Sequence, residues 1–149
     1  GCSVPAFVLT LQNAAWMFAQ LAEPSVAPEH YRDGLAHTFR AMRSYPEMVA
    51  NAGEIDTVLM QNISGLAAKG GAEGYYGLAL RETKHGPLGI VLKVEDGNMT
   101  AREPVVVRVL ELLGVLSEDN TLPWKRPVIR NHRKIETGHF EAAIELDWH

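Results

Sequence analysis

The sequence has 149 residues, of which 46% are hydrophobic and 21% charged, which is the composition of one globular domain spanning residues 1–149. Its 14 basic and 18 acidic side chains give a net charge of −4, which argues against nucleic acid as a partner. The sequence shows neither a positively charged leader nor the roughly 20 apolar residues that cross a bilayer, and Cys2 is its single cysteine, so we expect a cytoplasmic protein without membrane partners.

Three helices are predicted in the first part of the chain. The first begins after Thr10, a good N-cap residue, and ends before Pro24. The second spans residues 28–46, with a proline at each end, and the third lies between Gly53 and Gly65. The expected core-facing residues of these helices are, in order, Leu11, Ala14, Ala15, Phe18 and Leu21; Tyr31, Leu35, Thr38, Phe39 and Met42; and Ile55, Val58, Leu59 and Ile63.

An antiparallel meander of about three strands follows these helices. The strands are expected at residues 66–69, 75–80 and 88–94, because apolar and β-branched runs are separated there by glycine-rich or polar turns. Residues 95–98 then have the composition of a turn.

A buried helix is predicted at about residues 101–113. Thr100 and Glu103 have the spacing of a capping box, Pro104 would fall in the first turn, and Gly114 would end the helix. The helix is apolar around most of its circumference, as is typical of a helix buried on several sides.

The end of the chain is expected to contain a basic loop and two strands. Residues 125–134 are rich in lysine and arginine and are interpreted as a solvated loop. The alternating pattern of residues 134–146 predicts a last pair of strands.

The segment Lys69-Gly70-Gly71 is the most informative one for chemistry. Lys69 ends a strand of small residues, and an ammonium there can orient a substrate carboxylate or, with a lowered pKa, accept a proton from a serine. The glycines let another chain or a ligand approach the backbone, whose N–H groups can stabilise an oxyanion. The same residues also fit a glycine-rich hairpin turn that carries a solvated lysine.

The order of the elements resembles that of β-lactamases, penicillin-binding proteins and serine-dependent glutaminases, which place a lysine-x-glycine strand beside their serine. We therefore expect an α+β fold with an antiparallel sheet flanked by helices, resembling part of that fold. Longer stretches are similar to the bacterial L-asparaginase II family, the thermolabile, rhizobial-type class. These stretches are residues 1–7, 39–42, 45–50, 68–77 and 89–98, and the likeness extends from Gly1 to about Arg133.

This resemblance implies hydrolysis of L-asparagine to L-aspartate and ammonia through an acyl-enzyme, by a serine-x-x-lysine pair assisted by a second serine–lysine pair. Lys69 matches the lysine of the second pair, and the backbone of residues 70–74, beginning with Gly70 and Gly71, would shape the amide pocket. By analogy with the lysine-x-glycine enzymes, the N–H of Ala72 would be an oxyanion donor. No serine-x-x-lysine occurs in the sequence. The chain is thus interpreted as the C-terminal portion of the enzyme, with an N-terminal half as its partner and source of the nucleophile.

The family resemblance also bears on metals and assembly. Cys2 matches a cysteine that binds zinc in some members, together with ligands from the preceding half, whereas a single thiol leaves most of the four usual zinc positions unfilled. We expect no required cofactor, possible zinc through Cys2, and a homo-oligomer. Two alternatives stay open: a non-catalytic binding or assembly domain, and a glutaminase or β-lactam-type hydrolase on the same fold.

Overall fold

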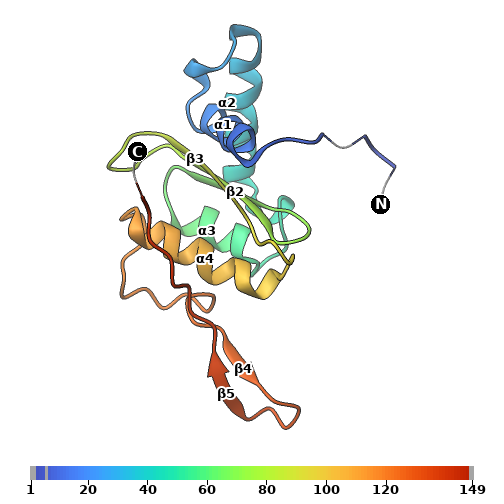
Figure 1. Cartoon of the computed structure of the whole chain (residues 1–149). Coiled ribbons are helices and arrows are strands. Elements are labelled where there is room, and N and C mark those ends of the chain that lie inside the picture. Colours follow the sequence, from blue (N-terminus) through green and yellow to red (C-terminus); the bar gives the residue numbers. More distant parts are fainter. Residues whose placement is uncertain (1–2, 6, 148–149) are drawn as a thin grey trace.

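The computed structural model describes residues 3–5 and 7–147. A three-stranded antiparallel sheet lies between α1 and α2 on one face and α3 and α4 on the other (Figure 1). Its strands, β1 (Leu66–Gly70), β2 (Tyr75–Leu80) and β3 (Leu88–Lys93), are adjacent in chain order. The α+β class, the meander and the flanking helices are therefore confirmed.

Helix α1 (Leu11–Ala22) packs directly on β2 and β3. Its N-cap is Thr10, whose hydroxyl accepts a hydrogen bond from the backbone N–H of Asn13 at 3.2 Å, as predicted from the sequence. The sheet meets the helix through glycines at positions 77 and 89, where a side chain would overlap α1. The absence of side chains there lets the helix approach the strand backbones closely.

Helix α2 (Glu29–Ser44) lies beside α1, and the short 3₁₀ turns Pro24–Val26 and Pro46–Met48 flank it. Its predicted bounds are confirmed, but its predicted core face is only partly correct. Phe39 is buried, whereas Tyr31 and Thr38 are exposed. Both exposed residues line a surface pocket between α1 and α2, together with Met17 of α1.

Helices α3 (Ile55–Asn62) and α4 (Met99–Leu112) cover the other face and complete the core with β1 and β2. The capping box predicted at Thr100 is wrong. The side chain of Asn98 caps α4 by accepting hydrogen bonds from the N–H groups of Thr100 and Ala101, so the helix begins earlier and Pro104 falls in its second turn. Gly114 ends the helix with φ +71°, as predicted.

The C-terminal region projects from the body as a hairpin of β4 (Val128–Arg130) and β5 (Glu136–His139) (Figure 1). The prediction of two strands within residues 134–146 is wrong, because the partner of β5 comes from the segment interpreted as a basic loop. Asn131 causes the reversal: its side chain accepts hydrogen bonds from the N–H groups of Arg133 and Ile135, and Lys134 adopts a φ of +60°. Within residues 3–5 and 7–147, no helix is long and apolar enough to cross a membrane.

Candidate active site

Lys69 lies on the outer strand of the sheet, opposite Gly77 of β2. Because side chains alternate along a strand, Lys69 projects from the sheet face on which α1 packs, and Gly70 faces α3 and α4. The Lys69 side chain is exposed, and its ammonium donates to the carbonyl of Gly70 at 2.5 Å. The predicted catalytic lysine therefore occupies an open strand edge that a second polypeptide could cover.

The turn after β1 determines which backbone donors are accessible. The N–H of Gly70 donates to Asp56 Oδ2 at 2.7 Å, and the N–H of Gly71 donates to the carbonyl of Tyr75 at 3.0 Å. Ala72 accepts a hydrogen bond from Tyr75 through its carbonyl, while its own N–H donates none within the described part of the chain. Of the three residues predicted to bind the substrate amide, Ala72 is thus the one whose N–H is open to a ligand.

Two buried charged residues, Asp56 of α3 and Arg102 of α4, contact this turn from the sheet face that α3 and α4 cover. Arg102 Nη1 donates to the carbonyls of Gly71 at 3.3 Å and Tyr75 at 3.5 Å. The same guanidinium lies 5.1 Å from the ring of Tyr76 and forms an ion pair with Glu103 at 3.7 Å, which makes a polar cluster inside an otherwise apolar interface.

The protonation of this cluster follows from its burial. Burial, together with the nearby Asp56 carboxylate, raises the pKa of the Tyr76 hydroxyl far above its usual range, so the hydroxyl stays neutral. Burial also raises the pKa of Glu103, and the Arg102 guanidinium opposes this effect. Arg102 is thus the cationic partner of Glu103 in this cluster.

Sequence reasoning did not identify Asp56 or Arg102. An acidic residue in the first turn of a helix is favourable in any helix, so the position of Asp56 in α3 gave no functional signal. Arg102 precedes the apolar run of α4 and resembles an ordinary solvated residue at a helix start. Their common role is visible only when α3 and α4 are packed against the same turn.

The prediction that Cys2 binds zinc concerns a residue that the structure does not describe. Among residues 3–5 and 7–147, no group of three or more histidine, cysteine, aspartate or glutamate side chains is arranged to hold a metal ion.

A model of the L-asparaginase II family matches residues 1–142, which is nearly the whole chain. The chain belongs to the L-asparaginase II family. The resemblance inferred from the sequence is therefore confirmed, and an asparaginase-type function is assigned at the level of the family. No curated protein matches the chain significantly.

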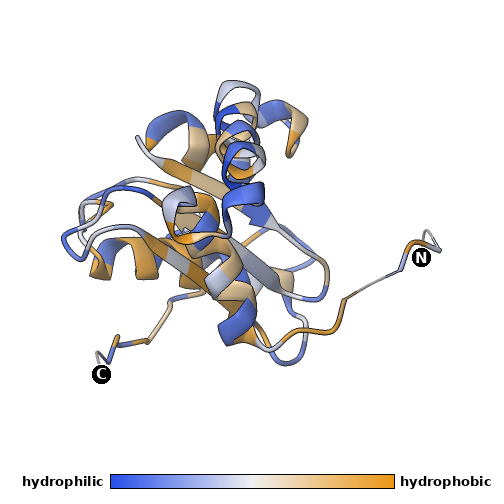
Figure 2. Ribbon diagram, turned by 90° about the horizontal axis from the view of Figure 1, so that it is seen from above, coloured by the Kyte–Doolittle hydropathy of each residue, from blue (hydrophilic) through white to orange (hydrophobic). Residues whose placement is uncertain are grey.

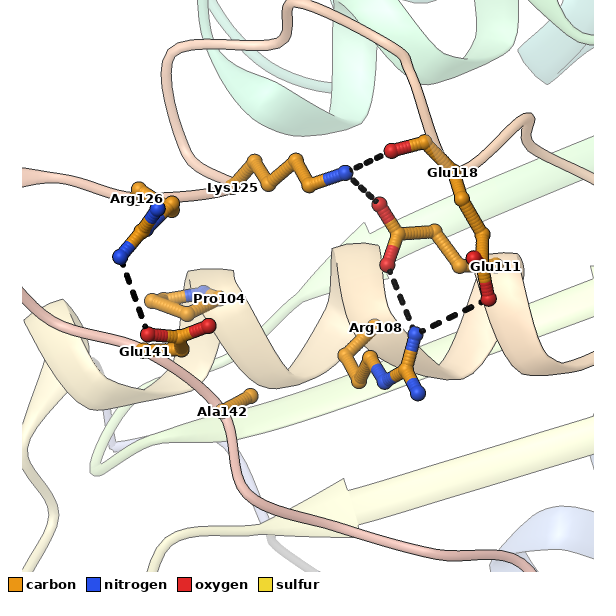
Figure 3. Close-up of a pocket in the computed structure, with 8 residues that line it drawn as sticks. All are labelled: Pro104, Arg108, Glu111, Glu118, Lys125, Arg126, Glu141 and Ala142. Carbon is orange, nitrogen blue, oxygen red and sulfur yellow. Dashed lines mark hydrogen bonds and ion pairs between the residues drawn. The ribbon is translucent and has the colours of Figure 1, made fainter.

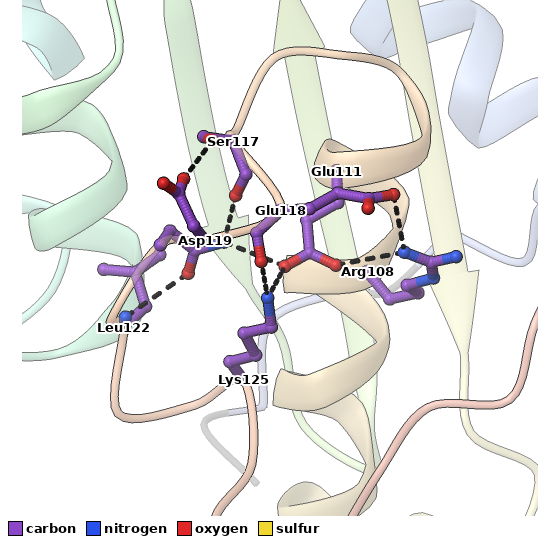
Figure 4. Close-up of polar contacts among 8 residues, drawn as sticks. Arg108, Glu111, Ser117, Glu118, Asp119, Leu122 and Lys125 are labelled. Atoms are coloured by element: carbon purple, nitrogen blue, oxygen red, sulfur yellow. Dashed lines mark hydrogen bonds and ion pairs between the residues drawn. The ribbon is translucent and has the colours of Figure 1, made fainter.

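A second polar cluster of this L-asparaginase II family member lies on the outer side of α4. It borders a cavity of about 320 Å³ lined by charged groups of α4 and of the C-terminal segment (Figure 3). Glu111, whose side chain is 3% exposed, contacts Lys125 Nζ at 2.7 Å and Arg108 at 3.2 Å (Figure 4). It also accepts a hydrogen bond from Asn120 at 2.8 Å. Arg126 pairs with Glu141 across the cavity. The charged groups thus neutralise one another and hold the C-terminal segment against α4.

Glu111→Gln is expected to lower the free energy of unfolding by about 1.5–3 kcal/mol at pH 7, because hydrogen bonds to a buried charge are lost. Burial acts to raise the pKa of Glu111, but the hydrogen bonds from Lys125, Arg108 and Asn120 prevail and lower it. The contribution of the carboxylate is therefore complete above its unfolded pKa of about 4.5 and is lost as the pH falls through the lower folded value.

Urea unfolding between pH 3 and pH 8 measures this difference. The matched control is Glu118→Gln: Glu118 also pairs with Arg108, at 3.5 Å, but its side chain is 78% exposed. We expect the control to change stability by less than about 1 kcal/mol. Equal effects of the two substitutions would contradict the assigned role of Glu111.

Proposed function

We propose that the chain is the C-terminal portion of a cytoplasmic L-asparaginase, which converts L-asparagine and water to L-aspartate and ammonia. The observation that carries the proposal is the family match over residues 1–142, a segment that includes Lys69 at an open strand edge. In this proposal Lys69 helps to activate the nucleophile or orient the substrate, Gly70 and Gly71 shape the amide pocket, and the N–H of Ala72 binds the oxyanion.

The proposed reaction proceeds through an acyl-enzyme. A serine Oγ from the N-terminal half attacks the carboxamide carbon of asparagine, and its proton passes to a lysine amine. The negative charge that develops on the carboxamide oxygen is stabilised by the Ala72 N–H. The carbon–nitrogen bond then breaks, ammonia leaves with the transferred proton, and water hydrolyses the serine ester to release aspartate.

The exposure of the candidate site supports the need for a second half. Ligand sites are concave and bury most of the ligand surface, whereas the Lys69 side chain is exposed in this chain, so a second segment would have to cover it to complete a substrate site. Large apolar side chains are also exposed near α1, including Phe7 at 90%, Val8 at 99% and Trp16 at 55%. The hydrophobic stretch that leads into α1 is visible in Figure 2. Such a surface is suited to covering by another protein segment.

Zinc remains part of the proposal only through Cys2. One thiolate from this chain would supply one ligand, and the N-terminal half would supply the others. The proposed reaction has no step that depends on zinc. We also propose that the complete enzyme assembles as a homo-oligomer.

Co-expression with the polypeptide encoded upstream of Gly1 tests the proposal. The purified complex should release ammonia from L-asparagine, and L-glutamine and a β-lactam should be tested in parallel as substrates of the two related hydrolase classes. Absence of ammonia release from an intact complex would refute the asparaginase proposal. Faster hydrolysis of glutamine or the β-lactam would replace the proposed substrate.

A non-catalytic assembly domain is the second candidate function, and the missing serine-x-x-lysine pair favours it. The two candidates differ in the behaviour of the isolated chain. A separated portion of an enzyme should self-associate through its exposed apolar surface, whereas an assembly domain that acts alone should stay monodisperse. Sedimentation velocity of the isolated chain distinguishes them, and addition of the N-terminal half should convert the associated form, but not the monodisperse one, to a defined complex.

A further inference from the structure

The turn that follows Lys69 is held by two oppositely charged side chains that come from different helices. Asp56 is 4% exposed and Arg102 is 6% exposed. A Cβ atom built on Gly70 would lie 3.2 Å from Arg102 Nη1 and 3.4 Å from each carboxylate oxygen of Asp56. Both charged groups therefore lie against the α-carbon of Gly70.

Each charged group binds a different part of the turn. The N–H of Gly70 points outward from the free edge of β1 and donates a hydrogen bond to Asp56 Oδ2 at 2.7 Å. Arg102 donates to the carbonyls at the start and the end of the turn, those of Gly71 and Tyr75. The anion thus fixes a donor and the cation fixes two acceptors, so the backbone between them has little freedom to rotate.

Maximal stability does not explain this cluster. Buried charged pairs often stabilise a protein no more than apolar residues of the same size. Here Arg102 Nε is buried without a hydrogen-bond partner among the described residues, which adds a cost. The role that remains for the cluster is to fix one backbone conformation of the turn.

We infer that Asp56 and Arg102 are positioning residues, which hold the backbone of residues 69–72 so that the Lys69 ammonium and the Ala72 N–H face the same substrate. This inference rests on the proposed asparaginase function and assigns to the fold two residues that act through the turn. Asp56 also closes the Gly70 N–H to ligands and so leaves Ala72 as the accessible donor.

The inference is tested with Asp56→Ala and Asp56→Asn in the complex with the N-terminal half. Misplacement of an oxyanion donor affects the transition state more than substrate binding, so Asp56→Ala should lower kcat by about 100-fold with KM nearly unchanged. The Asn side chain keeps an oxygen that accepts the Gly70 N–H, so Asp56→Asn should recover most of the lost kcat. Asp33→Ala, at an exposed position on α2, is the matched control and should have no effect.

Amide hydrogen exchange separates positioning from a general loss of stability. In Asp56→Ala, exchange at Gly70 should accelerate by about tenfold or more while the buried β2 residue Leu78 keeps its protection. Parallel acceleration at Gly70 and Leu78, or a kcat per folded molecule equal to that of the parent, would overturn the positioning role. If the parent complex itself released no ammonia, the proposed function and the catalytic purpose of the cluster would both fall, while exchange at Gly70 would still report whether Asp56 holds the turn.

Discussion

Ammonia release from asparagine is expected to fall by about 100- to 10,000-fold when Lys69 is replaced by alanine in the complex with the N-terminal half, which is the range for loss of a residue that transfers a proton. The chain should remain folded, because the Lys69 side chain is exposed. Steady-state kinetics on a variant with unchanged thermal unfolding would measure this effect.

Lys93→Ala provides a closely matched control. Lys93 ends β3 as Lys69 lies near the end of β1, it is exposed, and its ammonium also contacts the carbonyl of the next residue, at 2.6 Å compared with 2.5 Å for Lys69. The control should keep the activity of the parent. Equal activity of Lys69→Ala and Lys93→Ala would remove Lys69 from the mechanism.

Lys69→Arg distinguishes the two roles that remain open for this residue. Arginine keeps the positive charge but does not lose its proton near neutral pH. If Lys69 orients a carboxylate, the arginine variant should retain part of the activity. If Lys69 accepts a proton, it should be as inactive as the alanine variant.

The largest effect on stability is expected for Gly89→Ala, which should lower the free energy of unfolding by about 3 kcal/mol or more. The added Cβ would lie 2.1 Å from the carbonyl oxygen of Ala15 and 2.1 Å from the nitrogen of Ala19, both backbone atoms of α1. Since neither atom can move without the helix, α1 would have to withdraw from the sheet. Chemical denaturation monitored by circular dichroism would measure the loss.

Alanine substitutions at two other glycines serve as controls, because they distinguish the backbone clash at Gly89 from the general effect of replacing a glycine. A Cβ at Gly34 of α2 would meet nothing within 4 Å, so Gly34→Ala should stabilise the helix by about 0.5–1 kcal/mol. A Cβ at Gly77 would meet the ring of Phe18 at 2.1 Å, which is a side-chain clash. Shortening that side chain in Gly77→Ala/Phe18→Leu should recover part of the stability, whereas no side-chain substitution should rescue Gly89→Ala. A harmless Gly89→Ala would show that α1 does not pack as described.

Local signals in the sequence were sufficient for most of the secondary structure. The Thr10 cap, the prolines around α2 and the glycine after α4 act within one helical turn, so their effect can be recognised without knowledge of the fold. The same reasoning was wrong where two local signals compete: Asn98 and Thr100 can both cap α4, and Asn98 does so. It was also wrong for β4, because strand pairing depends on the turn at Asn131 and on the partner across it.

The order of residues determined the family, the α+β class and the place of Lys69 at the end of a strand, because each depends on runs of neighbouring residues. Packing alone brought the rest of the candidate site together. Asp56 and Gly70 are 14 positions apart, and Arg102 is 31 positions from Gly71, yet all four meet at one turn. A carboxylate and a guanidinium give no sign in the sequence of which backbone groups they bind, since that choice depends on how α3 and α4 pack against the sheet.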